Sequence, residues 1–359
     1  MKIMTIIGAR PQFVKAAMLS RAISEAGEGI EEISIHTGQH YDHAMSGVFF
    51  DELSMPEPAE NLGISGGTHG EMTGLMLPAL EGVMVRYEPT VVVVIGDTNS
   101  TMAGALAAAK LCIPIAHVEA GMRHYKRDIP EEINRVVTDH LSDLLFCSSD
   151  HSREALAREG ITRGVSVPGD ISYDLFKMSD RHRSDDATPD GPFVLCTIHR
   201  AANTDCPKRL ESIMRGIAAC PFPVFLPMHP RTAKAMERFG LDLPANVLAN
   251  EPVSYHTMLG LLAACEYVIT DSGGLQKEAF FAKKRCITLS EVSPWQELLD
   301  LDVDRLVGAS TDDLVGAYPW AASPIETSAQ PYGRGDAATR MVSGIVEAFS
   351  DSPEPVGLA

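Results

Sequence analysis

Short apolar runs rich in β-branched residues alternate with amphipathic stretches along nearly the whole chain. Continuous runs such as VVVVI at residues 91–95 are typical of strands covered on both faces, as in parallel sheets. The pattern predicts strands at Lys2–Ile7, Glu32–Thr37, Thr90–Ile95, Ile113–Val118, Leu144–Ser148, Phe193–Ile198, Val224–Met228, Val247–Ala249, Tyr267–Thr270, Cys286–Leu289 and Arg305–Val307. Apolar positions at helical spacing predict helices at Gln12–Glu25, Met72–Val85, Ser100–Leu111, Pro130–Leu141, Tyr255–Ala264, Leu275–Ala282 and Ala337–Ser350.

This alternating order predicts an α/β fold with parallel sheets, because parallel strands need helical crossovers. The stretch with the least regular pattern, Asp180–Pro192, reads DRHRSDDATPDGP and separates two strand-rich halves. We therefore expect two doubly wound domains, residues 1–170 and 171–336. The helix at residues 337–350 is expected to pack back across the first domain, and residues 351–359 are expected to form a tail.

Composition narrows the class of protein without indicating its chemistry. The 359 residues are 45% hydrophobic and 22% charged, as in ordinary globular proteins, and the net charge is −18. Such a charge argues against nucleic acid or an anionic membrane as a partner. Seven cysteines without a C-x-x-C pair, and an N-terminus with too short an apolar stretch for a signal peptide, predict a cytoplasmic protein without zinc.

Charged side chains follow several of the predicted strands in the first half. Arg10 lies in the turn after the first strand and Lys15 lies in the next helix, where both face the end of the sheet that binds ligands in such folds. The turn is not G-x-G-x-x-G, so a dinucleotide cofactor is not expected. A solvent-exposed pair of cations is the alternative at this position.

Three carboxylates of this half are also candidates for chemistry. Asp97 ends the VVVVIGD run, where it either points into the cleft or caps the next helix. Glu119 lies at the tip of the strand that contains His117, and Arg123 is its expected partner. Glu131 opens a helix behind a proline, a position that helix formation alone favours; its spacing also fits an ion pair with Arg135.

The second half contains a candidate phosphate site in ITDSGGLQKEAFF. The backbone N–H groups of Ser272, Gly273 and Gly274 precede a helix expected to begin at Leu275, and Glu278 lies one turn into it. A plain helix N-cap is the alternative. His199 follows another strand, and its spacing from other histidines does not fit a metal site.

Taken together and in order, these segments resemble the non-hydrolysing UDP-N-acetylglucosamine 2-epimerase family. The resemblance covers nearly the whole chain through GARPQFVK, TGQHYD, GDTNSTMAG, HVEAGMR, PEEINR, TIHR, PVSY, TDSGGLQKEA, RLVG and PYGRGDA. It implies two Rossmann-like domains facing across a cleft in a GT-B type fold, a homodimer, and interconversion of UDP-GlcNAc and UDP-ManNAc without metal or cofactor.

The resemblance also implies roles for individual residues. The positions that match the UDP-binding set are Arg10, Lys15, Ser272, Gly273, Gly274 and Glu278, and those that match the catalytic set are Asp97, Glu119, Glu131 and His199. Gln39 and His40 match a segment that forms a regulatory site in some relatives. The implied reaction eliminates UDP to give a 2-acetamidoglucal and then adds UDP back after protonation of C2 on the other face.

Two departures from the family pattern leave the substrate open. Ala202 stands where many relatives have Glu, and Trp295 stands where an Arg is common. TGQHYD and the tryptophan are similar to relatives that act on UDP-2,3-diacetamido-2,3-dideoxyglucuronate. The alternatives are therefore an epimerase for such a modified UDP-HexNAc, a hydrolysing epimerase, a GT-B glycosyltransferase and a non-catalytic UDP-sugar sensor.

Overall fold

The computed structural model describes residues 1–39, 56–126 and 128–350. Within these ranges, only the backbone of Arg10 is described and not its side chain. The chain divides into two compact units. Unit 1 comprises Met1–Leu175 and the chain from Gln330 onward, and unit 2 comprises Phe176–Ala329. The division falls within one helix, α7 (Ile171–Ser179).

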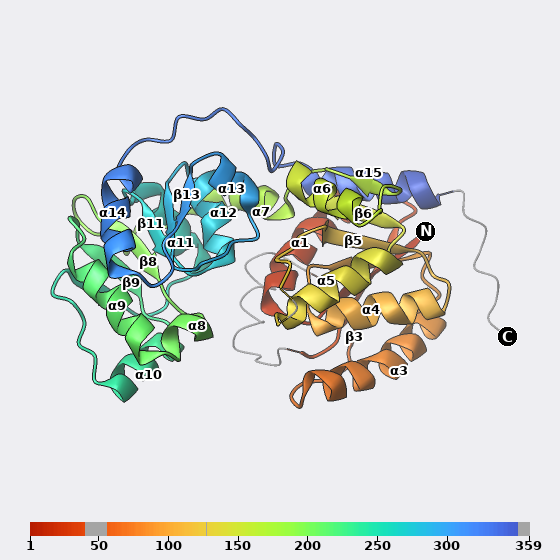
Figure 1. Cartoon of the computed structure of the whole chain (residues 1–359). Coiled ribbons are helices and arrows are strands. Elements are labelled where there is room, and N and C mark those ends of the chain that lie inside the picture. The colour runs from red at the N-terminus through yellow and green to blue at the C-terminus, as the bar shows by residue number, and fades with distance from the viewer. Residues whose placement is uncertain (40–55, 127, 351–359) are drawn as a thin grey trace. The chain divides into compact units, whose positions relative to one another are not determined.

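Unit 1 is built on a seven-stranded sheet in which neighbouring strands pair in parallel (Figure 1). The strand order is β3-β2-β1-β4-β5-β6-β7. The strands are β1 (Lys2–Ile7), β2 (Glu31–His36), β3 (Glu60–Asn61), β4 (Val91–Ile95), β5 (Ile115–Ala120), β6 (Leu144–Cys147) and β7 (Val165–Ser166). Besides α7, the helices are α1 (Arg10–Glu25), α3 (His69–Tyr87), α4 (Asn99–Lys110), α5 (Pro130–Leu141), α6 (Asp150–Arg158) and α15 (Ala337–Phe349).

Unit 2 repeats this architecture with six parallel strands in the order β10-β9-β8-β11-β12-β13. The strands are β8 (Val194–Thr197), β9 (Val224–Pro227), β10 (Val247–Asn250), β11 (Val268–Thr270), β12 (Cys286–Thr288) and β13 (Asp304–Leu306). The helical segments are η1 (Asp180–His182), α8 (Ala201–Thr204), α9 (Pro207–Ala218), α10 (Pro230–Phe239), α11 (Tyr255–Ala264), α12 (Gly273–Phe281), α13 (Gln296–Asp300) and α14 (Thr311–Ala321).

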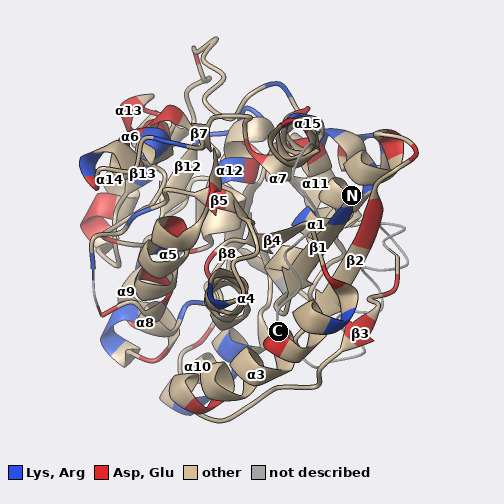
Figure 2. Cartoon of the chain, turned by 90° about the vertical axis from the view of Figure 1, so that its right-hand side faces the viewer, with Lys and Arg blue, Asp and Glu red and all other residues tan. Residues whose placement is uncertain are grey.

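Each sheet is buried between helices, as its sequence pattern predicts. All five residues of β4 are fully buried and none is charged, whereas the helices carry charges of both signs (Figure 2). The core of unit 1 includes Ile6, Ile35 and Val92, and the core of unit 2 includes Ile213 and Ile287. These residues lose their contact with water on folding, which is the main stabilising contribution to both units.

Both units therefore have the doubly wound order 3-2-1-4-5-6, with one added edge strand in unit 1. In this order successive strands are added first toward one edge of the sheet and then toward the other. The change of direction falls between β1 and β4 in unit 1, and between β8 and β11 in unit 2. Ligands of open α/β sheets bind beyond the carboxyl ends of the strands at that point. The candidate residues that follow β1, β4, β8 and β11 lie at these two positions.

The predicted strands and helices are confirmed, with small shifts at their ends. The strands β3 and β7 and the helices α6–α10, α13 and α14 were not predicted; the two strands have two residues each, too few to show a periodic pattern. The last helix, α15, packs against α1 within unit 1. Residues 351–359, expected to form a tail, lie outside the described residues.

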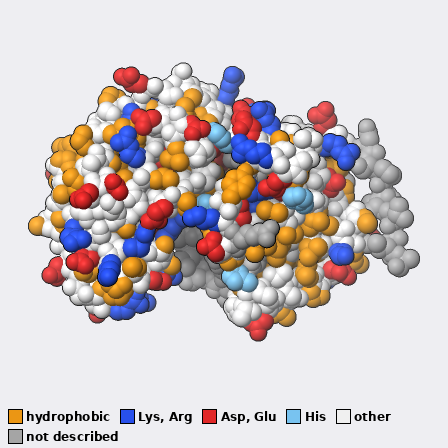
Figure 3. All heavy atoms as spheres, in the orientation of Figure 1, with side chains coloured by type: hydrophobic (Ala, Val, Ile, Leu, Met, Phe, Trp, Pro, Cys, Tyr) orange, Lys and Arg blue, Asp and Glu red, His pale blue; other side chains and the backbone are white. Residues whose placement is uncertain are grey.

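Among the helices that the structure describes, none is long and apolar enough to cross a membrane. On the face that Figure 3 shows, acidic, basic and hydrophobic side chains are interspersed.

Candidate active site

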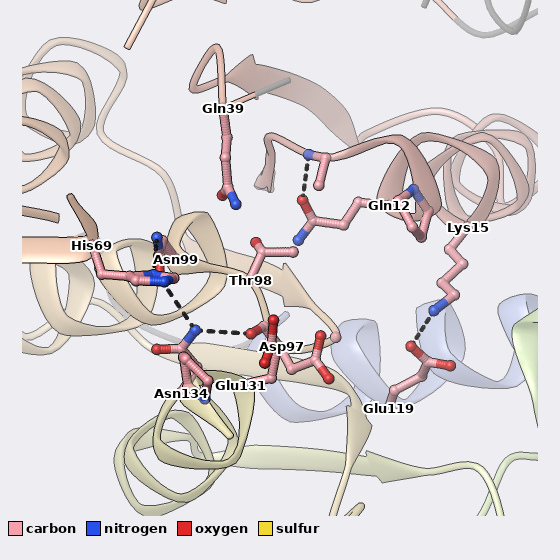
Figure 4. A pocket seen from close by; sticks show the side chains of 14 residues that line it. Gln12, Lys15, Gln39, His69, Asp97, Thr98, Asn99, Glu119, Glu131 and Asn134 are labelled. Carbon is pink, nitrogen blue, oxygen red and sulfur yellow. Dashed lines mark hydrogen bonds and ion pairs between the residues drawn. The ribbon is translucent and has the colours of Figure 1, made fainter. Parts of the chain in front are cut away.

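A pocket of about 260 Å³ opens in unit 1 beyond the carboxyl ends of β1, β4 and β5 (Figure 4). Ten of its fourteen lining residues have polar side chains, and the other four are Ala9, Pro11, Gly96 and Pro130. The polar side chains that line it are Gln12, Lys15, Gln39, His69, Asp97, Thr98, Asn99, Glu119, Glu131 and Asn134.

The turn after β1 is fixed to the turn after β4 by one buried amide. Gln12 accepts hydrogen bonds from the backbone N–H groups of Gly8 (2.8 Å) and Ala9 (2.9 Å) through Oε1, and its Nε2 donates to the carbonyl oxygen of Ile95 (2.7 Å). A Cβ at Gly8 would lie 2.1 Å from the Ser100 hydroxyl oxygen, so this turn requires glycine. The two strand ends that frame the pocket are thus held together.

Asp97 follows Gly96, whose φ of +67° turns the chain away from β4. Its carboxylate accepts two hydrogen bonds from Arg135, from Nε at 2.9 Å and Nη2 at 2.5 Å. Asn134 donates to the backbone oxygen of Asp97 at 2.9 Å. The N-cap of α4 is Thr98 and not Asp97. Of the two roles predicted for Asp97, capping the next helix or pointing into the cleft, the structure therefore has the second, because Asp97 lines the pocket.

Glu119 lies inside β5, but its φ is +68° and the register with β6 shifts between Val118 and Ala120. This bulge interrupts the alternation of side chains along the strand. The Glu119 carboxylate forms an ion pair with the Lys15 ammonium group, and its side chain is only 6% exposed. The expected pairing of Glu119 with Arg123 is wrong, because the Arg123 guanidinium pairs with Asp139 and Glu159 instead.

Glu131 begins α5 behind Pro130 and is exposed at the rim of the pocket. The expected ion pair between Glu131 and Arg135 is also wrong. Arg135 lies on the buried side of α5, where it bonds to Asp97 and Glu132. No ion pair of Glu131 occurs among the described residues.

The sequence did not point to Glu132, which neighbours Glu131 and whose carboxylate holds the loop before α5 in place. It accepts hydrogen bonds from the backbone N–H groups of His124 (2.9 Å) and Tyr125 (2.7 Å) and from Arg135 (2.8 Å). Burial raises the pKa of Glu132, but these donors outweigh burial and lower the pKa overall. Glu132 therefore stays ionised and holds the loop before α5.

The sequence did not point to Asn99, His69 or Asn134, and it placed Gln39 only in a possible regulatory site. The Asn99 amide contacts His69 Nδ1 at 3.1 Å, and Gln39 accepts a hydrogen bond from the Ser100 hydroxyl at 2.7 Å. The motifs GDTNSTMAG and PEEINR contain Asn99 and Asn134 and could have indicated them, since both follow strand ends or open a helix. His40 and the side chain of Arg10 lie outside the described residues.

In unit 2, Asp271 follows β11 and links the end of this strand to the end of its neighbour β8. This fully buried carboxylate accepts hydrogen bonds from the backbone N–H groups of His199 (3.0 Å) and Arg200 (2.9 Å) and from the Asn203 amide (3.1 Å). The imidazole of His199 is about one-third exposed and lies 5.3 Å from the ring of His229, centroid to centroid. Asp271 therefore fixes the backbone that carries His199.

The turn after β11 differs in one respect from the prediction. The helix α12 begins at Gly273 and not at Leu275, so Gly273 and Gly274 form its first turn and Ser272 is its N-cap. The N–H groups of a first helical turn have no partner within the helix and point toward an anion bound at that end. Glu278 lies in the second turn, where burial and the negative charge of Glu278 raise the pKa of Tyr255.

Trp295 is buried against the same first turn. Its indole N–H donates to the carbonyl oxygen of Gly273 at 2.8 Å, and the Lys277 ammonium lies 4.1 Å from the centre of its ring. Lys277 is itself only 3% exposed. The tryptophan that replaces the common arginine thus supports the glycine turn and keeps a cation beside it. Ala202 lies exposed in α8.

The described residues contain no group of three or more His, Cys, Asp or Glu side chains arranged to hold a metal ion. Two parallel sheets of this order, each with polar residues at its reversal point, define a protein of two Rossmann-like units. The crystal structure of Methanocaldococcus jannaschii UDP-GlcNAc 2-epimerase in complex with UDP-GlcNAc and UDP has this fold, with a TM-score of 0.86 and 36% identity over 97% of this chain and 100% of that one.

The fold also matches that of the calicheamicin glycosyltransferase CalG4, a likeness of fold alone at a TM-score of 0.51 and 16% identity over 97% of this chain and 94% of that one. A family model described as UDP-N-acetylglucosamine 2-epimerase matches residues 21–346. The chain belongs to this family of non-hydrolysing, GT-B-like UDP-HexNAc 2-epimerases. It is 46% identical, over 95% of its own length and 98% of the relative's, to the UDP-2,3-diacetamido-2,3-dideoxy-D-glucuronate 2-epimerase of Pseudomonas aeruginosa.

Proposed function

We propose that the protein inverts C2 of a UDP-linked 2-acetamido sugar, and that its substrate is UDP-2,3-diacetamido-2,3-dideoxyglucuronate. The observation that carries the reaction is the convergence of Asp97, Glu119 and Glu131 on one pocket of unit 1 in a chain of this family. The observation that favours this substrate is the 46% identity with a relative of that specificity. UDP-GlcNAc is the second candidate, because the M. jannaschii relative bound to it is 36% identical.

The arrangement of carboxylates fits elimination followed by addition. The hydrogen on C2 is not next to a carbonyl group, so its direct removal by a base would be very slow. When the C1–O bond breaks, UDP leaves with the electron pair, and the positive charge that develops at C1 makes the C2 proton acidic. A pocket carboxylate takes that proton to give the 2-acetamidoglucal. Proton delivery to the other face of C2 and return of the UDP oxygen to C1 complete the inversion.

The three carboxylates meet different partners, and this supports a division of labour among them. Asp97 forms an ion pair with Arg135 and Glu119 forms one with Lys15, and we propose that these two carboxylates stabilise positive charge at C1. Glu131 is exposed at the rim and has no such cation among the described residues, which leaves it suited to exchange a proton. Which of the three carboxylates acts on which face of C2 is left open by this proposal.

We further propose that unit 2 holds the uridine diphosphate. The first turn of α12 offers the backbone N–H groups of Gly273 and Gly274 to phosphate oxygens, with Ser272 beside them. Glu278 is proposed to accept hydrogen bonds from the ribose hydroxyls, and His199 to stabilise the departing phosphate. Arg10 and Lys15 complete this set by resemblance to the family.

The test is to incubate the protein with UDP-2,3-diacetamido-2,3-dideoxyglucuronate and, separately, with UDP-GlcNAc, and to follow the H1–H2 coupling by proton NMR. The expected result is conversion of the first sugar to its C2 epimer with UDP still attached, at a higher kcat/KM than for UDP-GlcNAc. A higher kcat/KM for UDP-GlcNAc would reverse the order of the two substrates.

The same reactions separate the remaining alternatives. Free sugar together with free UDP would indicate a hydrolysing epimerase. UDP release that depends on an added acceptor would indicate a glycosyltransferase, and binding of every UDP-HexNAc without turnover would indicate a sensor.

A further inference from the structure

His117 is a fully buried histidine whose two ring nitrogens both face acceptors. Its Nε2 lies 2.8 Å from the carbonyl oxygen of Gly96, and its Nδ1 lies 2.7 Å from a carboxylate oxygen of Asp139. A carbonyl oxygen can only accept, so Nε2 carries a proton. The second contact also needs one proton, either on Nδ1 or on the carboxyl group.

The surroundings of Asp139 place that second proton on the ring. The other carboxylate oxygen accepts from Arg123 Nη1 at 2.6 Å and from the backbone N–H of Gly121 at 3.1 Å. The charged guanidinium of Arg123 and this backbone N–H are both donors, and neither can accept a proton, so they favour the ionised form of the Asp139 carboxylate. An ionised Asp139 leaves both ring nitrogens of His117 protonated, and the ring is an imidazolium.

The charges of this cluster balance. Arg123 also bonds to Glu159, through Nε at 2.7 Å and Nη2 at 2.8 Å. The imidazolium and the guanidinium thus face two carboxylates, Asp139 and Glu159. A buried cation is tolerated when it is paired and hydrogen-bonded in this way.

The cluster holds the backbone on either side of the pocket carboxylates. Gly96, which His117 contacts, immediately precedes Asp97 in the chain. Gly121, which Asp139 contacts, has a φ of +80°, and a Cβ there would lie 2.3 Å from the carbonyl oxygen of Ser152. Between the two anchored residues His117 and Gly121 lies the bulge that carries Glu119 at a φ of +68°.

We infer that His117 is a positioning residue that, as an imidazolium bridging Asp139 and Gly96, fixes Asp97 and Glu119 relative to each other. It does not line the pocket. The consequence for turnover rests on the proposed function. The protonation of the ring and the contact with Gly96 do not, and they are testable in the free protein.

The first measurement is made on the wild-type chain labelled with ¹⁵N-histidine. Spectra at pH 8.5 are expected to show one ring with protons on both nitrogens, and that ring is expected to be absent from the spectra of the His117→Gln and His117→Asn variants. A wild-type spectrum in which every histidine carries a single ring proton at this pH would overturn the inference, whatever substrate the enzyme uses.

The second measurement uses these two variants as a matched pair. Both remove the positive charge, but a Gln amide reaches the position of Nε2 and keeps the donor to Gly96, whereas an Asn amide reaches that of Nδ1 and keeps only the contact with Asp139. We expect His117→Asn to lower kcat about 100-fold and His117→Gln to stay within about tenfold of wild type, with KM little changed in both. Equal kcat values per folded molecule would overturn the positioning role.

Failure of the proposed function is distinguishable from failure of this inference. A wild-type protein that turns over no UDP-HexNAc but shows the doubly protonated ring would refute the proposed function and support the imidazolium. In that case the positioning role is tested by the NMR chemical shift of the backbone amide of Asp97 instead of by kcat. It is expected to shift in His117→Asn and to stay close to wild type in His117→Gln, and an equal shift in both would overturn the positioning role.

Discussion

At the scale of single residues, the pocket carboxylates are distinguished by their partners and not by their type. Asp97 is bound by Arg135, Glu119 by Lys15, and Glu131 remains exposed at the helix start. The sequence identified all three carboxylates, because each follows a strand end or opens a helix. It did not identify their partners, because Lys15 and Arg135 reach them across elements that are distant in the chain.

Glu119→Gln removes a negative charge while keeping the shape of the side chain and a partner for Lys15. We expect turnover to fall by roughly 10²–10⁴-fold, the range usual for loss of a proton-transfer or charge-stabilising carboxylate. The melting temperature is expected to stay close to wild type. Glu25→Gln is the matched control, since Glu25 is exposed on α1 and pairs only with Arg21 among the described residues. Turnover of Glu119→Gln at the level of this control would contradict a role in the reaction.

We predict that the stability of unit 2 depends on pH because of the buried Asp304. Burial raises the pKa of Asp304 to about 7, against which its hydrogen bond from Thr288 acts only in part. The folded state therefore binds a proton more tightly than the unfolded state, and the wild-type free energy of unfolding decreases as the pH rises from about 4 to about 7. The amide side chain introduced by Asp304→Asn cannot ionise, so the free energy of unfolding of the variant does not decrease in this way as the pH rises.

The change is measured by urea unfolding of the wild type and of Asp304→Asn at pH 5 and pH 8. We expect the free energy of unfolding of the variant, relative to wild type, to be higher at pH 8 than at pH 5 by about 2–4 kcal/mol. Asp312→Asn, at an exposed position in the first turn of α14, is the control and is expected to show no such difference. The same value at both pH values would show that Asp304 ionises normally in the folded state.

At the scale of elements, the site is made by the turns that follow strands. Period-two alternation and helical spacing were enough to predict most strands and helices, because burial on two faces leaves a clear apolar run. The β5 bulge at Glu119 and the early start of α12 at Gly273 could not be predicted in this way. Both depend on backbone conformations that are set by neighbouring elements, here β6 for the bulge and the indole of Trp295 for the helix start.

Trp295→Phe tests the glycine turn at the start of α12. The variant loses the hydrogen bond to the Gly273 carbonyl oxygen but keeps an aromatic ring beside Lys277. Loss of one such bond is worth about 1 kcal/mol, so we expect the dissociation constant of UDP, measured by calorimetry, to rise about 3–10-fold.

Trp320→Phe is the control in the same unit. Its indole N–H donates to Asp302 at 3.0 Å, so this variant loses a comparable hydrogen bond away from α12. We expect its dissociation constant to equal that of the wild type. Equal affinities for UDP in the Trp295 and Trp320 variants would rule out support of the UDP site by Trp295.

At the scale of the whole molecule, two units share one strand order, and each places polar residues where its sheet reverses direction. The sequence predicted this architecture, because the alternation of strands and helices leaves few other topologies. The net charge of −18 argues against polyanionic partners but says little about the site. The pocket of unit 1 shows why. Its own carboxylates are part of that negative charge; Glu119 pairs with Lys15, and Asp97 shares Arg135 with Glu132.

The central claim is reversible removal of the C2 proton, and incubation in D₂O tests it most directly. We expect deuterium at C2 of the product from UDP-2,3-diacetamido-2,3-dideoxyglucuronate, detected by NMR and mass spectrometry, with UDP still attached and with Glu119→Gln at least about 100-fold slower. Absence of deuterium from C2 of this sugar and of UDP-GlcNAc, in a folded wild-type protein that binds UDP, would contradict the account.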